Sequence, residues 1–191
     1  MAQGELDSFQ GVKFDLGRGL VSVDDASYRV LVPSELLAEL LAQSGSDTAR
    51  DFGRRIGTEM GRRVSSRLGD KTKQASVEEM LGELGAELGL AGLGSLGVER
   101  WGRALVMTVG DSPLGRRGDG LIASVLEGAI QRALGRDAVL VLLGHSDNQL
   151  RLLVVSPRTA ARVEQWLASG TPWTEALNRL HQSAAQGGGG E

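Results

Sequence analysis

Few side chains in this sequence could carry out covalent or metal chemistry. The chain has no cysteine and two histidines, His145 and His181, which excludes a thiolate nucleophile and any cysteine-ligated zinc or iron–sulfur site. His145 precedes the turn-forming residues 146–148 and is interpreted as a turn residue. No Gly-x-Ser-x-Gly motif places a serine nucleophile in a catalytic turn. We therefore expect no enzyme activity, no bound metal and no cofactor.

Arginines form the most concentrated charge in the chain. They lie along a predicted helix from Thr48 to about Leu68, on the face opposite its apolar residues: Arg50, Arg54, Arg55, Arg62, Arg63 and Arg67. Guanidinium groups bind phosphates and carboxylates in a bidentate manner, so Arg54, Arg55, Arg62 and Arg63 are candidate partner- or ligand-binding residues. The alternative is a solvated face with a few ion pairs to Asp47, Asp51 and Glu59.

The same helix carries glycines at every fourth position, Gly53, Gly57 and Gly61. Each glycine costs about 1 kcal/mol relative to alanine inside a helix, so a close contact must offset the cost. Three uses stay open. The glycines could let another element of the same chain pack against the helix, they could form a homodimer contact, or they could line a ligand tunnel.

Two further regions supply candidate binding residues. The segment from Asp111 to Asp119 is a predicted loop with Arg116 and Arg117 at its centre, and long loops often carry function. It lacks the Gly-Lys-Ser/Thr ending of a phosphate loop, and the alternative is a flexible connector. Trp166 and Trp173 lie on two closing helices, where they either anchor the core or form a partner surface.

The length and composition of the chain limit the classes of function that it can have. A length of 191 residues fits one domain. The net charge of −3 and the 4% aromatic content argue against nucleic-acid binding. No apolar run approaches the roughly 20 residues that span a bilayer, so no integral membrane segment is expected. The acidic, polar N-terminus has no signal-peptide features, and a cytoplasmic location is expected.

Apolar periodicity predicts an α+β fold. Alternation over 12–32 predicts two or three short strands, and strand pairs are predicted at 93–100 with 104–109 and at 138–143 with 150–155. Helices are predicted over 34–43, 48–68, 77–89, 120–134 and in two short closing segments, with Asp47 capping the second and a Ser76–Glu79 capping box starting the third. This order predicts an antiparallel sheet of about four to six strands with helices packed on one face.

The sequence also predicts where the folded domain begins and ends. Residues 1–10 are expected to be a flexible N-terminus, 11–183 a single α+β domain, and 184–191 a disordered Gly-rich tail.

The sequence resembles the 4-vinyl-reductase-type domain family. That family shares a fold with the TRAPP vesicle-tethering subunits and is related to haem nitric-oxide-binding sensors. The resemblance covers roughly residues 20–156. It rests on Arg29-Val-Leu-Val-Pro33, the Leu-rich helix after it, the Asp51–Gly57 and Met80–Leu90 segments, and the later strand pairs. Bacterial members often carry cysteines in the last hairpin, where this chain has Gly144-His-Ser-Asp-Asn-Gln149. A cysteine metal site is therefore absent there.

The resemblance implies two functions of different classes. As a TRAPP-like scaffold, the chain would form a homodimer and dock a protein partner such as a small-GTPase system. As a 4-vinyl-reductase-type sensor, it would hold an apolar or tetrapyrrole-like small molecule in an enclosed pocket near the glycines. The missing cysteines and scarce aromatic residues favour the scaffold. A third reading, an enzyme of tetrapyrrole metabolism, has no general acid or cofactor motif to support it.

Overall fold

Six α-helices, seven strands and one 3-10 helix make up the part of the chain that the computed structural model describes, residues 12–23, 27–69, 76–102, 104–135, 137–146 and 148–186. Their bounds are β1 Val12–Asp15, β2 Leu20–Val23, β3 Ser27–Arg29, α1 Ser34–Ser44, α2 Ser46–Leu68, α3 Val77–Leu90, β4 Ser95–Trp101, β5 Ala104–Gly110, η3 Gly115–Gly118, α4 Asp119–Leu134, β6 Val139–Ser146, β7 Gln149–Val155, α5 Pro157–Ala168 and α6 Trp173–Gln186.

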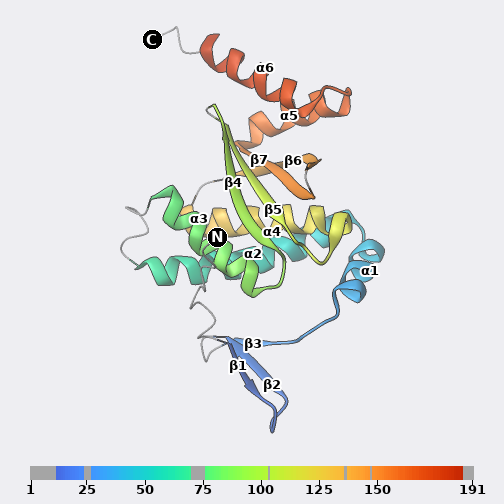
Figure 1. Ribbon diagram of the computed structural model, residues 1–191, viewed down its shortest axis with the longest axis vertical. Helices are drawn as coiled ribbons and strands as arrows, with labels where there is room; N and C mark the ends of the chain where they lie inside the picture. Colours follow the sequence, from blue (N-terminus) through green and yellow to red (C-terminus); the bar gives the residue numbers. More distant parts are fainter. Residues whose placement is uncertain are drawn as a thin grey trace.

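The strands form two separate antiparallel sheets. The larger has the order β4-β5-β7-β6, and the smaller is a β1-β2-β3 meander. In Figure 1 the larger sheet lies at the centre, with α2, α3 and α4 below it and α5 and α6 above, while the small sheet lies at the bottom, below α2. The α+β fold class predicted from the sequence is therefore confirmed.

Helices cover both faces of the larger sheet, and the expectation that they pack on one face is corrected. Met107, Leu140 and Leu152 belong to the core shared with α2, α3 and α4. Their neighbours Val106, Val141 and Leu153 belong to a second core with α5 and α6. The physical reason is that β5, β6 and β7 are apolar at consecutive positions, so both faces of the sheet need burial.

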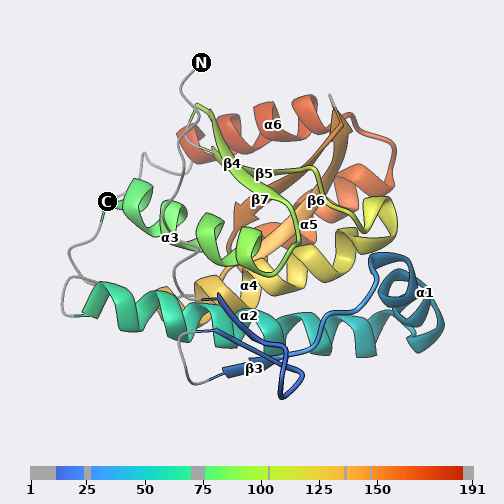
Figure 2. The ribbon, with the colours of Figure 1, turned by 60° about the horizontal axis from the view of Figure 1, so that its bottom comes forward.

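Helices α2 and α4 approach each other to backbone contact. A Cβ at Gly57 would lie 1.9 Å from the Val125 carbonyl oxygen, and one at Gly61 would lie 2.5 Å from that of Ala129. The contact is reciprocal, because a Cβ at Gly128 of α4 would lie 2.4 Å from the Arg54 carbonyl oxygen. Figure 2 shows the two helices side by side. Of the three uses open to the glycines, packing within the chain is the one seen here.

Local sequence signals predicted some helix boundaries correctly and others incorrectly. The Ser76–Glu79 capping box is present, and the Ser156 side chain caps α5. Asp47 does not cap α2, because the helix already begins at Ser46 behind Gly45, whose φ of 81° favours glycine. Helix α6 continues to Gln186, into the segment expected to be a disordered tail. The expected flexible N-terminus and residues 187–191 lie outside the described residues.

Candidate ligand cavity and the predicted binding residues

A cavity of about 770 Å³ lies between the small sheet and α2. We call it the N-terminal cavity. Its walls come from the small sheet and the segment after it, from α2 and from the end of α3: Val12, Phe14, Val21, Val23, Arg29, Val30, Leu31, Phe52, Ile56, Glu59, Met60, Arg63, Leu90 and Ala91. Its volume falls within the range of about 300–1,000 Å³ that small-molecule sites occupy.

The lining of this cavity is apolar with a few charged groups. Val23 and Met60 are buried, while Phe14 and Phe52 are partly exposed. Arg29, Glu59 and Arg63 are the charged residues among its walls, and Glu59 already accepts a hydrogen bond of 3.0 Å from Arg62. Such a cavity suits a mainly apolar molecule that carries one polar group.

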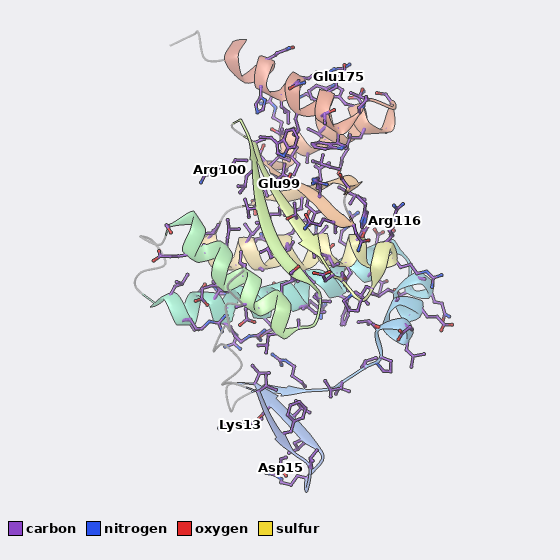
Figure 3. The ribbon with its side chains drawn as sticks, in the orientation of Figure 1. Lys13, Asp15, Glu99, Arg100, Arg116 and Glu175 are labelled. Atoms are coloured by element: carbon purple, nitrogen blue, oxygen red, sulfur yellow. The ribbon has the colours of Figure 1, made fainter. Side chains whose placement is uncertain are left out.

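Large apolar side chains are exposed around the small sheet and along α1. Leu16 is 88% exposed and Val30 is 84% exposed. We call the full set the N-terminal apolar surface: Phe14, Leu16, Val30, Leu31, Val32, Leu36 and Leu40. Figure 3 shows Lys13 and Asp15 on the same hairpin, away from the body of the molecule. Exposed apolar residues in such number can mark sites of interaction.

The candidate arginines of α2 have different surroundings. Arg54 lies 3.4 Å from Glu127 of α4, and Arg62 pairs with Glu59 on its own helix, as the solvated-face alternative expected. Arg55 is exposed and has no ion-pair partner among the described residues. Their assignment as binding residues stays a prediction.

Arg63 is not on a solvated face, because it points towards α3. It lies 2.5 Å from Glu87, whose side chain is fully buried, and Arg67 lies 2.6 Å from the same carboxylate. Burial lowers the pKa of Arg67, but hydrogen bonds and charge from Glu83 and Glu87 outweigh it and raise that pKa. This cluster ties α3 to α2. Sequence reasoning missed Glu87 because nothing local distinguishes it from a solvated helix glutamate.

The candidate glycines do not line the N-terminal cavity. Gly53, Gly57 and Gly61 face α4, so the pocket expected beside them does not lie on that face. The cavity instead opens on the neighbouring face of α2, which carries Ile56 and Met60. The ligand-binding assignment of the glycines remains a prediction, although their contacts with α4 already explain their presence.

The predicted 111–119 loop folds against the end of the last hairpin. It contains η3 with Arg116 and Arg117, both exposed, and Figure 3 shows Arg116 beside the start of α4. A pocket of about 290 Å³ lies there, lined by residues that include Asp111, Arg116 and His145. Asp111 has a left-handed φ of 55°, a strained conformation that often occurs at functional sites.

His145 corrects one sequence interpretation. It lies in β6 rather than in a turn, because a bulge between Leu142 and Gly144 lets the β6–β7 pairing continue to Ser146. Its Nε2 lies 2.9 Å from Asp119, the first residue of α4. The other histidine, His181, lies against Gly102. Within the described ranges, no group of three or more His, Cys, Asp or Glu residues could hold a metal ion.

The two candidate tryptophans serve as covers over the second core. Trp173 packs edge-on against Trp101 with ring centroids 5.0 Å apart. The guanidinium groups of Arg162 and Arg179 lie over the Trp166 ring, at 5.4 and 5.9 Å from its centroid. Both pack against the buried residues beneath α5 and α6, which fits the core-anchor interpretation; their role as a partner surface stays a prediction.

An ion pair joins β4 and β7 beside these tryptophans. Arg151 Nη2 donates to Glu99 Oε1 at 3.0 Å, and Trp101 Nε1 donates to Glu99 Oε2 at 2.9 Å. These two hydrogen bonds, the one from Arg151 being the stronger cause, lower the pKa of Glu99 below its ordinary value of 4.5. Figure 3 labels Glu99 on the long hairpin arm that reaches α6.

Comparison with known proteins gives a structural neighbour. No protein-family model and no curated protein matches the chain. Among solved structures, the phenol-responsive sensory domain of the transcription activator PoxR, crystallised with phenol, matches with a TM-score of 0.59 and 15% identity, over 91% of this chain and 98% of that one. At this identity the match shows the fold alone. The architecture is consistent with a 4-vinyl-reductase-like fold, and no comparison supports the TRAPP assignment.

No helix within the described residues is long and apolar enough to cross a membrane.

Proposed function

We propose that the chain is a non-catalytic sensor domain that binds a small, largely apolar molecule in the N-terminal cavity. The observation that carries this proposal is the cavity itself, about 770 Å³ in volume and walled mainly by apolar side chains. Its fold neighbour is a sensory domain that responds to phenol. The sensor reading therefore replaces the scaffold reading as the favoured function, and we place the domain in the cytoplasm.

Binding can be measured on the purified chain without knowing the ligand in advance. Native mass spectrometry reports any small molecule retained from the host, and thermal unfolding with phenol and larger apolar ring compounds reports added ligand. A ligand at 100 times its Kd stabilises by about 2.7 kcal/mol. For a chain of this size, that raises the melting temperature by about 5–10 °C.

A blocking variant locates the site. Ala91 is exposed and lines the N-terminal cavity at the end of α3, so Ala91→Trp fills the cavity without disturbing the core. Its matched control is Ala168→Trp, an exposed position at the end of α5 that lies outside this cavity. We expect Ala91→Trp to abolish the thermal shift and Ala168→Trp to retain it. If no compound binds, or if both variants bind alike, the N-terminal cavity is not the ligand site.

A second candidate function is homodimerisation, favoured by the N-terminal apolar surface. Seven large apolar residues are exposed there, more than scattered surface apolar residues account for. A second copy of the chain would bury them. The predicted protein partner belongs to this candidate, because exposed apolar side chains can equally be buried by another protein. Sedimentation of the purified chain at several concentrations tests it, and a concentration-independent monomer would refute it.

A further inference from the structure

A second groove, of about 690 Å³, lies between the α1–α2 junction and α5. We call it the arginine groove because three arginines line it. Its lining includes Arg50, Arg54, Arg117, Glu127, Leu142 and Glu164. It shares no residue with the N-terminal cavity.

The arginines reach this groove from two separate elements. Arg50 and Arg54 lie one turn apart on α2, and Arg117 comes from η3. Arg50 and Arg117 are exposed and have no ion-pair partner within the part of the chain that the structure describes. Two arginines without such an ion pair therefore line one groove, and planar guanidinium groups match phosphate and carboxylate oxygens.

The third arginine is held in place by a fixed carboxylate. Glu127 Oε1 accepts a hydrogen bond of 2.9 Å from the Leu140 amide, which fixes this side chain between α4 and β6. Its other oxygen lies 3.4 Å from Arg54 Nη2. Half of the Arg54 side chain stays exposed, at 50%, so its remaining N–H donors can face a bound anion.

Apolar residues form part of the groove as well. Leu121, Leu140 and Ala160 form buried parts of its lining, and Leu142 is 45% exposed. The first turn of α2 also borders it at Gly45 and Ser46, and no side chain caps that helix. A ligand that fits this lining has an anionic head for the arginines and an apolar body for the Leu142 side.

We propose that the arginine groove binds an organic phosphate, with the phosphoryl group on Arg50, Arg54 and Arg117 and an apolar or ring-shaped body against Leu142. A dianionic phosphoryl group matches three guanidinium groups better than a single carboxylate does. The one unpaired acidic residue in the lining, Glu164, is exposed and repels such a ligand. This site is independent of the apolar molecule proposed for the N-terminal cavity.

Calorimetric titration of the full chain with phenyl phosphate at low salt tests the proposal. We expect saturable binding that weakens about tenfold in Arg50→Gln and in Arg117→Gln, the loss expected for one charge-assisted contact. Glu164→Gln removes a repelling charge and should tighten binding. Arg55→Gln is the matched control, because Arg55 is also unpaired on α2 but does not line the groove, and its Kd should stay unchanged.

Two further titrations separate this site from the other cavity. Benzoate has the same ring with one negative charge and should bind more weakly than phenyl phosphate. Ala91→Trp, which blocks the N-terminal cavity, should leave phenyl phosphate binding intact. The proposal is overturned if phenyl phosphate shows no saturable binding, if Arg55→Gln weakens it as much as Arg50→Gln does, or if Ala91→Trp abolishes it.

Discussion

Two regions of this molecule differ in how closely the rest of the chain packs against them. In the α2–α4 pair, glycines allow backbone contact, and a Cβ at Gly57 would fall 1.9 Å from the opposing carbonyl oxygen. In the β1–β3 sheet and the segment after it, Leu16 and Val30 are 88% and 84% exposed. The first region finds its partners within the chain. The second has apolar side chains without such partners, which is where an external molecule gains most from binding.

The difference also predicts that mutations in the two regions affect different properties, stability in one and binding in the other. In the α2–α4 pair, sequence changes act on the folded state itself, because neighbouring backbone cannot move away. In the N-terminal region they act on what the chain binds, because little of its own structure depends on those side chains. The predictions below test this division, from the largest expected effect on stability to the smallest.

Gly57→Leu should prevent folding at ordinary temperatures. A side chain at this position overlaps the Val125 carbonyl and the Ala129 amide of α4, and a loss of at least about 4 kcal/mol places it among severe core changes. Circular dichroism and denaturant unfolding check the outcome. The matched control is Gly82→Ala in α3, where a Cβ meets nothing within 4 Å; it should stabilise by about 0.5–1 kcal/mol. A folded, wild-type-like Gly57→Leu chain would refute the contact.

Glu87→Ala should lower the free energy of unfolding by about 3–5 kcal/mol, because it leaves Arg63 and Arg67 without their buried counter-charge. The comparison is Glu59→Ala, which breaks an exposed pair with Arg62 and should cost no more than about 0.5 kcal/mol. Urea unfolding of both variants measures the difference. Equal losses would mean that the Glu87 cluster does not hold α3 on α2.

The sequence predicted the fold class and most elements because those follow from local periodicity and capping. The α2 stripe, the Ser76–Glu79 capping box and the strand pairs all depend on residues close together in the chain. The strands were apolar at consecutive positions, a sign that both faces of the sheet would be covered, yet one-sided packing was expected.

The candidate sites were less predictable, because they depend on contacts distant in sequence. Glu87 meets Arg63 across 24 positions, and His145 meets Asp119 across 26. No local pattern distinguishes these residues from solvated ones. The arginine groove shows the same limit: Arg54 and Arg117 were predicted as binding residues in separate segments and Arg50 was not, and the three line one groove only because the fold brings α2 and η3 together. The N-terminal cavity likewise requires the small sheet to lie against α2.

Acid should weaken the link between β4 and β7. The folded-state pKa of Glu99 lies below its ordinary value of 4.5, first because of Arg151 and then because of Trp101. Its contribution is therefore complete above pH 4.5 and is lost as the pH falls through the lower folded-state value. Because Glu99 is partly exposed, we expect at most about 1 kcal/mol. Unfolding of the wild type and Glu99→Gln at pH 7 and pH 3 checks this: the difference between them should be smaller at pH 3 than at pH 7.

The smallest change in stability should come from the N-terminal apolar surface, where Leu16→Ser and Val32→Ser replace exposed side chains that lie outside the N-terminal cavity. We expect the free energy of unfolding of the monomer to change by less than about 0.5 kcal/mol. Sedimentation should nevertheless shift towards monomer, because each substitution removes apolar area that a second copy would bury. Apolar ligand binding should persist, since neither residue lines the cavity.

A double variant that sediments like the wild type would show that this surface does not mediate self-association. A double variant that unfolds would show that Leu16 and Val32 pack within the chain, and the contrast between the two regions would then fail.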